Sequence, residues 1–476
     1  MGLWDSSMKK KCLFTSGMCI LALLVGTTAY AEIDSETKYV FDTFAFLVYG
    51  FLVMWMAAGF TMLEAGSVRV KSTGVICFKN MGLYAITGIM FFLFGYNLMY
   101  VDVSGWIGSF TLGVGPSEAE IALLQAESAT REMVDAVVSN GYSTMSDWFF
   151  QMVFVATTAS IVSGALAERV KLWPFFGFIA VLTGLIYPVV GAWTWGGGWL
   201  SEYGFSDFAG STIVHSTGGW AALAGVILVG PRLGKFRDDG TVLPTPASNI
   251  PLVTLGVFIL WLGWFGFNGG SQLSLGSAAD VTWMAVIFVN TNLAACGGVL
   301  AAIVTARLMH GKVSLLLVLN GAISGLVSIT AAPILLNMEF AILVGVIGGV
   351  LCTVGMHLLE KFRVDDVVGA IPAHLIAGIW GTIAAAIFGG ANMGAQLLGI
   401  FAIGAFVMAT SFGLWMILKL TTGIRVSESD ENLGQDLVEL GMEAYPEFMT
   451  LSEDDIQEAI RHKESKLASK SKPKNE

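Results

Sequence analysis

The sequence predicts an all-α polytopic membrane protein with eleven transmembrane helices, arranged as a 5+5 inverted repeat plus one helix. Of its 476 residues, 55% are hydrophobic and only 13% are charged, whereas soluble domains carry about 25% charged residues. Apolar segments of about 20 residues, the length that a bilayer requires, recur along the chain. The loops between them alternate in lysine and arginine content, which is typical of a chain that crosses the membrane repeatedly.

The first 31 residues predict a cleavable signal peptide. In "MKKKCLFTSGMCILALLVGTTAYAE" a basic start is followed by a short apolar run and an A-Y-A site, which are the three parts of such a peptide. Cleavage would follow Ala31. The membrane domain would then span residues 32–420, and residues 421–476 would form a cytoplasmic tail that ends in a charged segment poor in apolar residues.

Eleven apolar segments follow the signal peptide. They cover residues 39–63, 74–100, 147–167, 172–192, 208–229, 250–268, 281–306, 314–331, 337–358, 367–390 and 396–420. The chain also contains 57 glycines. In a membrane, small residues let helices approach one another closely, so we expect a tightly packed bundle.

Positive charges between the segments predict the orientation of the chain. Lysines and arginines fall in every second connection: Arg69 and Lys71; Arg169 and Lys171; Arg232, Lys235 and Arg237; Arg307 and Lys312; Lys361 and Arg363. The exception is Arg131, in the acidic loop 101–146. Because positive loops stay in the cytoplasm, the mature N-terminus is expected outside and the tail inside. The signal peptide predicts the same orientation.

Two histidines lie inside apolar segments at matching positions. "HSTGGWAA" starts at His215 in the fifth segment, and "HLIAGIWG" starts at His374 in the tenth. An odd number of spans in each half makes the second half enter from the opposite side, which would carry both histidines to the midplane. An ionisable group at that depth costs about 3 kcal/mol. The pair is therefore a functional candidate, and the alternative is two core histidines bonded to backbone carbonyls.

Other functions are less compatible with the composition. A net charge of −11 argues against a nucleic-acid partner, which a basic surface would recognise. Outside the signal peptide, Cys77, Cys296 and Cys352 lack a C-x-x-C spacing, so no disulfide framework or zinc site is indicated. Two histidines without a third ligand do not make a hydrolytic metal site. We expect no metal, no other cofactor and no enzymatic activity.

Seven segments carry a resemblance to one known family. In chain order they are "MLEAGSVRVKST", "FQMVFVATTASIVSGALAERVKLW", "WTWGGGWL", "DFAGSTIVH", "WFGFNGGS", "RVDDVVGAIPAHLIAGIWG" and "GIRVSESDENLGQDLVELGMEAYPEF". Together they resemble the ammonium transporter family (Amt/Mep/Rh), and its Amt branch in particular, over residues 39–450. The resemblance implies a homotrimer in the cell membrane with one pore per subunit. It also implies docking of a PII-type regulator at the cytoplasmic face if the source is bacterial.

The resemblance also implies a role for eight residues. His215 and His374 would be the twin pore histidines, and Phe154 and Phe267 would stack as a hydrophobic gate. Trp195, Ser271 and Phe150 would form the external cation site, which Asp207 would support. Four of these residues also have a plainer alternative: Trp195 as an interfacial tryptophan, the two gate phenylalanines as packing residues, and Asp207 as a helix N-cap.

The chemistry of these residue types fits ammonium. Aromatic faces attract a desolvating cation by about 1–2 kcal/mol, and the Ser271 hydroxyl adds one acceptor. A dry phenylalanine gate would exclude hydrated ions but pass neutral ammonia. Burial favours uncharged imidazole at the two histidines, which can then accept and donate protons. The leading hypothesis is a transporter that deprotonates ammonium and relays the proton. The alternatives are a passive ammonia channel and an ammonium sensor that signals through its tail and a separate partner.

Overall fold

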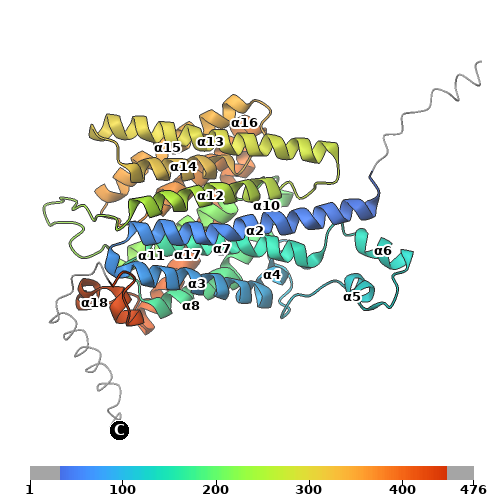
Figure 1. The fold of residues 1–476 in the computed structure, drawn as a ribbon, viewed down its shortest axis with the longest axis horizontal. Coiled ribbons are helices and arrows are strands. Elements are labelled where there is room, and N and C mark those ends of the chain that lie inside the picture. The colour runs from blue at the N-terminus through green and yellow to red at the C-terminus, as the bar shows by residue number, and fades with distance from the viewer. Residues whose placement is uncertain (1–32, 447–476) are drawn as a thin grey trace, which may run out of the picture.

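The computed structural model describes residues 33–446, which form a bundle of helices (Figure 1). Within this range the only extended pairings are two isolated bridges, Val170 with Arg425 and Phe236 with Val242. The all-helical prediction is therefore confirmed for these residues. The predicted signal peptide, residues 1–31, and the charged end of the tail, residues 461–476, lie outside the described residues.

Ten helices, some of them interrupted by π-helical or 3₁₀ turns, are long and apolar enough to span a membrane among the described residues. They are α2 (Ser35–Ser67); η1 (Val70–Ser72) with α3 (Thr73–Met90), η2 (Phe91–Gly95) and α4 (Tyr96–Tyr100); α7 (Thr144–Ala165); α8 (Leu172–Val181) with η3 (Leu182–Ile186) and α9 (Tyr187–Trp193); η4 (Ser211–Ser216) with α11 (Thr217–Val229); α12 (Ile250–Gly270); α13 (Ala278–His310); α15 (Met338–Lys361); η5 (Ile371–Ile376) with α16 (Ala377–Gly389); and α17 (Met393–Thr421).

The predicted segment 314–331 is observed as α14 (Leu315–Ile329), an apolar helix of 15 residues. At about 1.5 Å per residue it is about 22 Å long, shorter than the hydrocarbon core of about 30 Å. The helix packs between α13 and α15 and buries most of its side chains. A count of eleven spans therefore remains a prediction that depends on α14.

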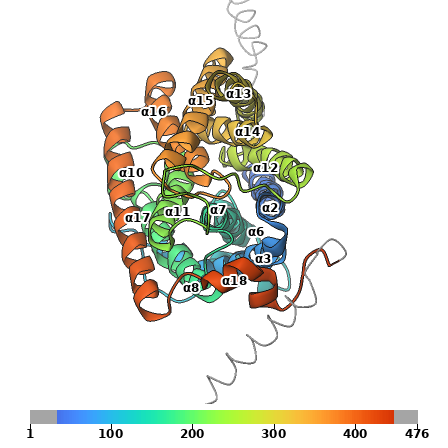
Figure 2. The same ribbon diagram turned by 90° about the vertical axis from the view of Figure 1, so that its left-hand side faces the viewer.

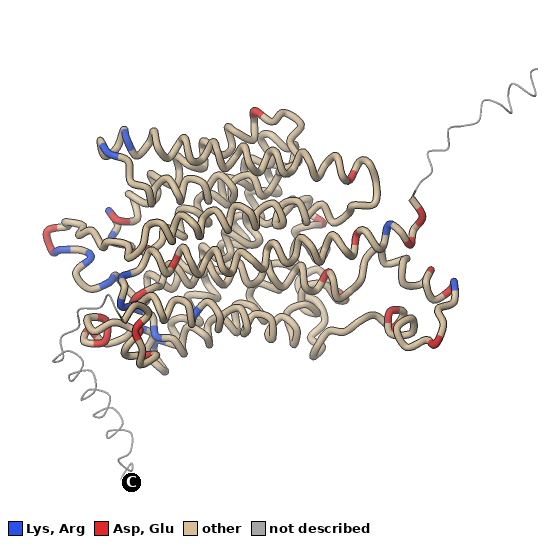
Figure 3. The backbone as a smooth tube through the Cα atoms, in the orientation of Figure 1, with Lys and Arg blue, Asp and Glu red and all other residues tan. Residues whose placement is uncertain are grey.

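Five shorter helices lie at the two ends of the bundle or between spans. They are α5 (Glu118–Gln125), α6 (Arg131–Val138), α10 (Trp199–Glu202), α18 (Glu428–Leu433) and η6 (Asp436–Leu440). Helices α5 and α6 project at one end, and α18 lies at a corner of the other (Figure 1); we name these the α5–α6 end and the α18 end. Lysine and arginine gather at the α18 end (Figure 3), as the alternating loops predict.

Helix α7 is the most completely buried span and contacts α2, α3 and α11. Seen from the α18 end, it lies among these helices near the middle of the bundle (Figure 2). Its apolar and small residues face neighbours on all sides, because a helix that is apolar all round is buried. This position allows α7 to contribute side chains to the interior of the bundle.

The two segments that carry the histidines share one local design. Each begins with a six-residue π-helical turn, η4 or η5, and continues as a 13-residue α-helix. Ahead of η4 the Asp207 carboxylate accepts backbone N–H groups, and ahead of η5 the Asp366 carboxylate accepts those of Gly369 and Ile371. The two π-helical turns contact each other. This likeness is what two copies of one repeat would produce.

Glycines bring α13, α14 and α15 into close contact. A Cβ added at Gly345 would overlap the carbonyl oxygen of Ala294, and one at Gly298 would overlap that of Gly321. Small residues permit this distance in a membrane bundle. The expectation that glycine serves close helix packing is confirmed at these positions.

A buried ionic cluster ties helix ends together at the α18 end. Arg232 donates to Asp365 at 2.8 Å and to Glu168 at 2.8 Å, and all three side chains are at most 5% exposed. Arg69 also pairs with Glu168. Burial alone would raise the pKa of Asp365, but the hydrogen bonds and charge of Arg232 outweigh it and lower the pKa below its usual range. Asp365 thus anchors Arg232, while Asp366 caps η5.

Candidate functional site

The two histidines meet at the centre of the bundle. The Nδ1 atoms of His215 and His374 lie 3.2 Å apart, and the side chains are 0% and 3% exposed. A hydrogen bond at this distance requires a proton on one Nδ1 and a lone pair on the other. The Nε2 atom of His215 has no hydrogen-bond partner among the described residues, which leaves it available to a ligand.

An aromatic stack leads from His215 toward the α5–α6 end. The rings of His215 and Phe267 lie 5.2 Å apart at 25°, and those of Phe267 and Phe154 lie 4.0 Å apart at 29°. Trp264 stacks on His215 at 5.1 Å and donates from Nε1 to Thr330 at 2.9 Å. The two phenylalanines are therefore in direct contact with each other and, through Phe267, with the histidine pair.

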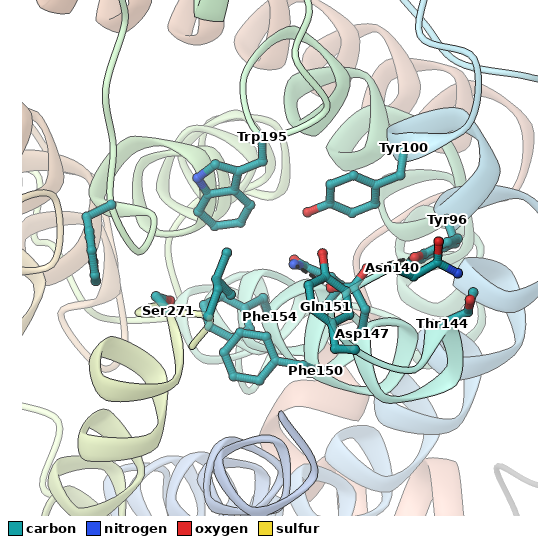
Figure 4. A pocket seen from close by; sticks show the side chains of 13 residues that line it. Tyr96, Tyr100, Asn140, Thr144, Asp147, Phe150, Gln151, Phe154, Trp195 and Ser271 are labelled. Atoms are coloured by element: carbon teal, nitrogen blue, oxygen red, sulfur yellow. Dashed lines mark hydrogen bonds between the residues drawn. The ribbon is translucent and has the colours of Figure 1, made fainter. Parts of the chain in front are cut away.

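A cavity of about 420 Å³ lies on the α5–α6 side of Phe154. It brings together four of the predicted residues: Phe150, Phe154, Trp195 and Ser271. Figure 4 shows Trp195 facing Phe150 and Phe154 across this space, with Ser271 at its edge. The rings of Trp195 and Phe154 are 6.0 Å apart and nearly perpendicular. The Ser271 hydroxyl donates to the carbonyl of Phe267 at 2.8 Å, so its oxygen keeps lone pairs for another donor.

Asp207 lies behind the cavity rather than in its wall. Its carboxylate accepts the backbone N–H groups of Gly210, Ser211, Thr212 and Ile213 at 2.8–3.0 Å. Its carbonyl oxygen accepts the Nε1–H of Trp195 at 2.9 Å. Asp207 thus accepts the first N–H groups of η4 from three residues ahead of Gly210, the N-cap residue of that turn. Asp207 also holds the Trp195 indole, which connects the cap to the cavity.

The cavity contains a carboxylate that sequence reasoning missed. Asp147 is 6% exposed and lines the cavity with Gln151. It accepts from the Tyr96 hydroxyl at 2.7 Å and from Gln151 Nε2 at 3.3 Å. The signal was present in the spacing, because Asp147, Gln151 and Phe154 lie on one face of a helix at intervals of four and three residues. Trp264 was missed as well, although it is the first residue of the segment "WFGFNGGS".

A metal site does not accompany these residues. Within residues 33–446, no group of three or more histidine, cysteine or carboxylate side chains is placed to hold a metal ion. What the arrangement offers is an aromatic cavity with acceptors, a dry aromatic contact and two bonded imidazoles. Such an arrangement can bind a small cation and pass a proton and a small neutral molecule.

The sequence matches known proteins along nearly its whole length. The model of the Ammonium Transporter Family matches residues 44–445. Ammonium transporter Amt2 of Archaeoglobus fulgidus is 39% identical, over 90% of this chain and 94% of that protein. The ammonium transporter of Bacillus subtilis is 32% identical, over 85% of this chain and 98% of its own length.

The fold matches solved structures of the same group. A structure titled Sensor Amt Protein has a TM-score of 0.76 and 31% identity, covering 85% of this chain and 99% of that one. Mep2 of Candida albicans has a TM-score of 0.72 and 25% identity, covering 88% of this chain and 94% of its own. The chain therefore belongs to the ammonium transporter family and is a multi-pass protein of the cell membrane.

Proposed function

We propose that this protein transports ammonium by binding the cation in the aromatic cavity, removing a proton, and conducting ammonia past the two histidines while they relay the proton. The observation that carries this proposal is the continuous order of parts: cavity, Phe154 on Phe267, Phe267 on His215, and His215 on His374. In this order the cavity binds the cation, the two phenylalanines exclude hydrated ions, and the two histidines carry the proton.

Recognition takes place in the cavity. Trp195 and Phe150 present aromatic faces, each such contact contributing about 1–2 kcal/mol toward a desolvating cation, and Ser271 supplies an acceptor. Asp147 adds a buried negative charge to the same wall. Potassium prefers several oxygen ligands, whereas ammonium can donate hydrogen bonds and stack on rings.

Deprotonation follows at the two phenylalanines. Rings whose centroids are 4.0 Å apart leave no room for a hydrated ion between them, so only ammonia passes when side-chain motion opens the gate. The proton enters the His215–His374 pair, whose 3.2 Å separation supports direct transfer. Net charge then crosses the membrane with each ammonia molecule.

Orientation and assembly complete the proposal. We place the α18 end in the cytoplasm because lysine and arginine gather there, with α14 as the eighth of eleven spans in a 5+5+1 arrangement. The shared design of η4–α11 and η5–α16 supports the inverted repeat. We also propose assembly as a homotrimer and, if the source is bacterial, docking of a PII-type regulator at the α18 end; membership of the family supports both.

Electrical recording on proteoliposomes tests the mechanism. An ammonium jump is expected to evoke a saturable current in the unaltered protein, with no current on a sodium jump. His215→Ala and His374→Ala are expected to abolish the current or its selectivity, because either change breaks the Nδ1–Nδ1 contact. A silent unaltered protein that still alkalinises the vesicle interior would contradict proton relay and indicate a passive ammonia channel.

A sensor is the second candidate function, favoured by the structural neighbour titled Sensor Amt Protein. The tail offers a route for a signal, since the Asp436 carboxylate accepts the backbone N–H groups of Gly74 and Val75 at 2.8 and 2.7 Å. Ammonium binding without current or alkalinisation in the same vesicles would support the sensor and overturn transport.

A further inference from the structure

A small cavity lies on the side of the histidine pair that faces away from Phe154 and Phe267. His374 lines it together with Phe60 and Glu64 of α2, Ser160 of α7 and Asn320 of α14. The space open to the centre of a water-sized molecule is about 10 Å³, which corresponds to about one water. The cavity therefore continues the path from the histidines toward the α18 end.

Glu64 is the acidic group in the wall of this cavity. The side chain is 0% exposed. Its Oε2 accepts from the Ser163 hydroxyl at 2.6 Å and from Asn80 Nδ2 at 3.2 Å, while its Oε1 has no hydrogen-bond partner among the described residues. A buried oxygen without a partner costs about 1–3 kcal/mol. This oxygen is therefore suited to take a proton or a donor from a passing ligand.

Lys79 lies next to the same carboxylate without forming a direct ion pair with it in the described structure. Its Nζ donates to the Ser163 carbonyl at 2.8 Å and lies 5.1 Å from the centre of the Phe175 ring. Ser163 thus connects the two charged groups through its hydroxyl and its carbonyl. The positive charge of Lys79 offsets the negative charge of Glu64 while leaving Glu64 Oε1 without a partner.

We propose that Glu64 is the proton acceptor beyond the histidine pair, a role that rests on the proposed function above. Protonated His374 passes its proton, through one water in the cavity, to Glu64 Oε1, and the imidazole becomes neutral. When ammonia leaves the histidines, the O–H bond of Glu64 breaks and an N–H bond forms. Ammonium and the Glu64 carboxylate result, and the acceptor is restored for the next cycle.

The test compares the ammonium-evoked current of the unaltered protein with that of Glu64→Gln in proteoliposomes. The amide keeps the shape of the side chain but cannot accept the proton. We expect the maximal current to fall at least about 100-fold, the lower end of the typical contribution of one acid–base group. The half-saturating ammonium concentration is expected to stay unchanged, because Phe154 and Phe267 separate the aromatic cavity that binds ammonium from Glu64. A maximal current equal to that of the unaltered protein would overturn the proposal.

A second variant separates proton transfer from charge balance. In Glu64→Gln with Lys79→Met, neither buried charge remains, so no uncompensated charge destabilises the fold. A current that stays low in this double variant supports the proposal. A restored current would overturn it, since Glu64 would then serve only to neutralise Lys79. If Glu64→Gln alone does not fold, the double variant carries the test by the same two outcomes.

Two controls make the result specific. Glu360→Gln removes a carboxylate at the α18 end that pairs with Lys235 and does not line the small cavity of Glu64 and His374. The current of this variant is expected to match that of the unaltered protein. Failure of the proposed function would appear in the unaltered protein itself as absence of current, and it would overturn the role of Glu64 too. Failure of the Glu64 proposal alone would appear only in the variants.

Discussion

Ser271 lies at the edge of the binding cavity, and its hydroxyl proton already forms a hydrogen bond. The hydroxyl donates to the Phe267 carbonyl at 2.8 Å, so its oxygen can still accept a hydrogen bond. We predict that Ser271→Ala raises the half-saturating ammonium concentration about tenfold, because a hydrogen bond to a charged group contributes about 1.5–3 kcal/mol. The maximal current is expected to remain. Current measured over a range of ammonium concentrations checks both values.

Two neighbouring variants frame this prediction. Ser271→Thr keeps the hydroxyl and is expected to keep the half-saturating concentration near that of the unaltered protein. Ser274→Ala removes a hydroxyl that donates to Asp280 and does not line the cavity, so it serves as the control. An unchanged concentration dependence in Ser271→Ala would mean that the aromatic rings alone recognise the cation.

The histidine pair was predictable from the sequence, whereas the Glu64–Lys79 pair was not. The match between the surroundings of His215 and His374 was visible in the letters, and the structure brings the two rings together. Glu64 and Lys79 are 15 positions apart, on two helices, and meet only through Ser163 of a third helix. No helical period relates such residues, so their meeting could not be predicted from the sequence.

At the scale of elements, the helices were predictable because bilayer length and hydropathy determine them. The shortness of α14 was not, since the helix ends at Ile329 while small and apolar residues continue in the sequence to Ala331 and Ala332. The π-helical turns η4 and η5 were also unforeseen. Each widens the helix by one residue where a histidine must face the other histidine, and π-helical turns are frequent at functional sites.

A pair of glycines tests how closely the elements pack. Gly345 of α15 has no space for a Cβ beside the carbonyl of Ala294, whereas Gly88 of α3 has nothing within 4 Å. We predict that Gly345→Ala lowers the free energy of unfolding by about 1–3 kcal/mol through overpacking. Gly88→Ala is expected to raise it by about 1 kcal/mol, the difference in helix propensity. Thermal unfolding in detergent measures both, and equal shifts would refute close packing at α15.

At the scale of the whole molecule, function depends on which end of the bundle faces the cytoplasm. The aromatic cavity opens near the α5–α6 end, and the Glu64 cavity lies on the far side of the histidines from it. The proposed order of binding, deprotonation and proton return is an uptake mechanism only if the α5–α6 end is outside. The lysines and arginines at the α18 end in Figure 3 support that orientation. These charges orient the chain during its insertion into the membrane and take no part in conduction.

Cysteine labelling of intact cells decides the orientation. With all five native cysteines replaced by alanine, Ser128→Cys places one exposed thiol between α5 and α6, and Asp238→Cys places one in the loop after α11. A membrane-impermeant maleimide is expected to label Ser128→Cys in intact cells and Asp238→Cys only after the membrane is opened. The two sites control for each other, because both are exposed and differ only in the side of the membrane. The reverse pattern would make the Glu64 cavity the outward one, and the same residues would then have to work in export.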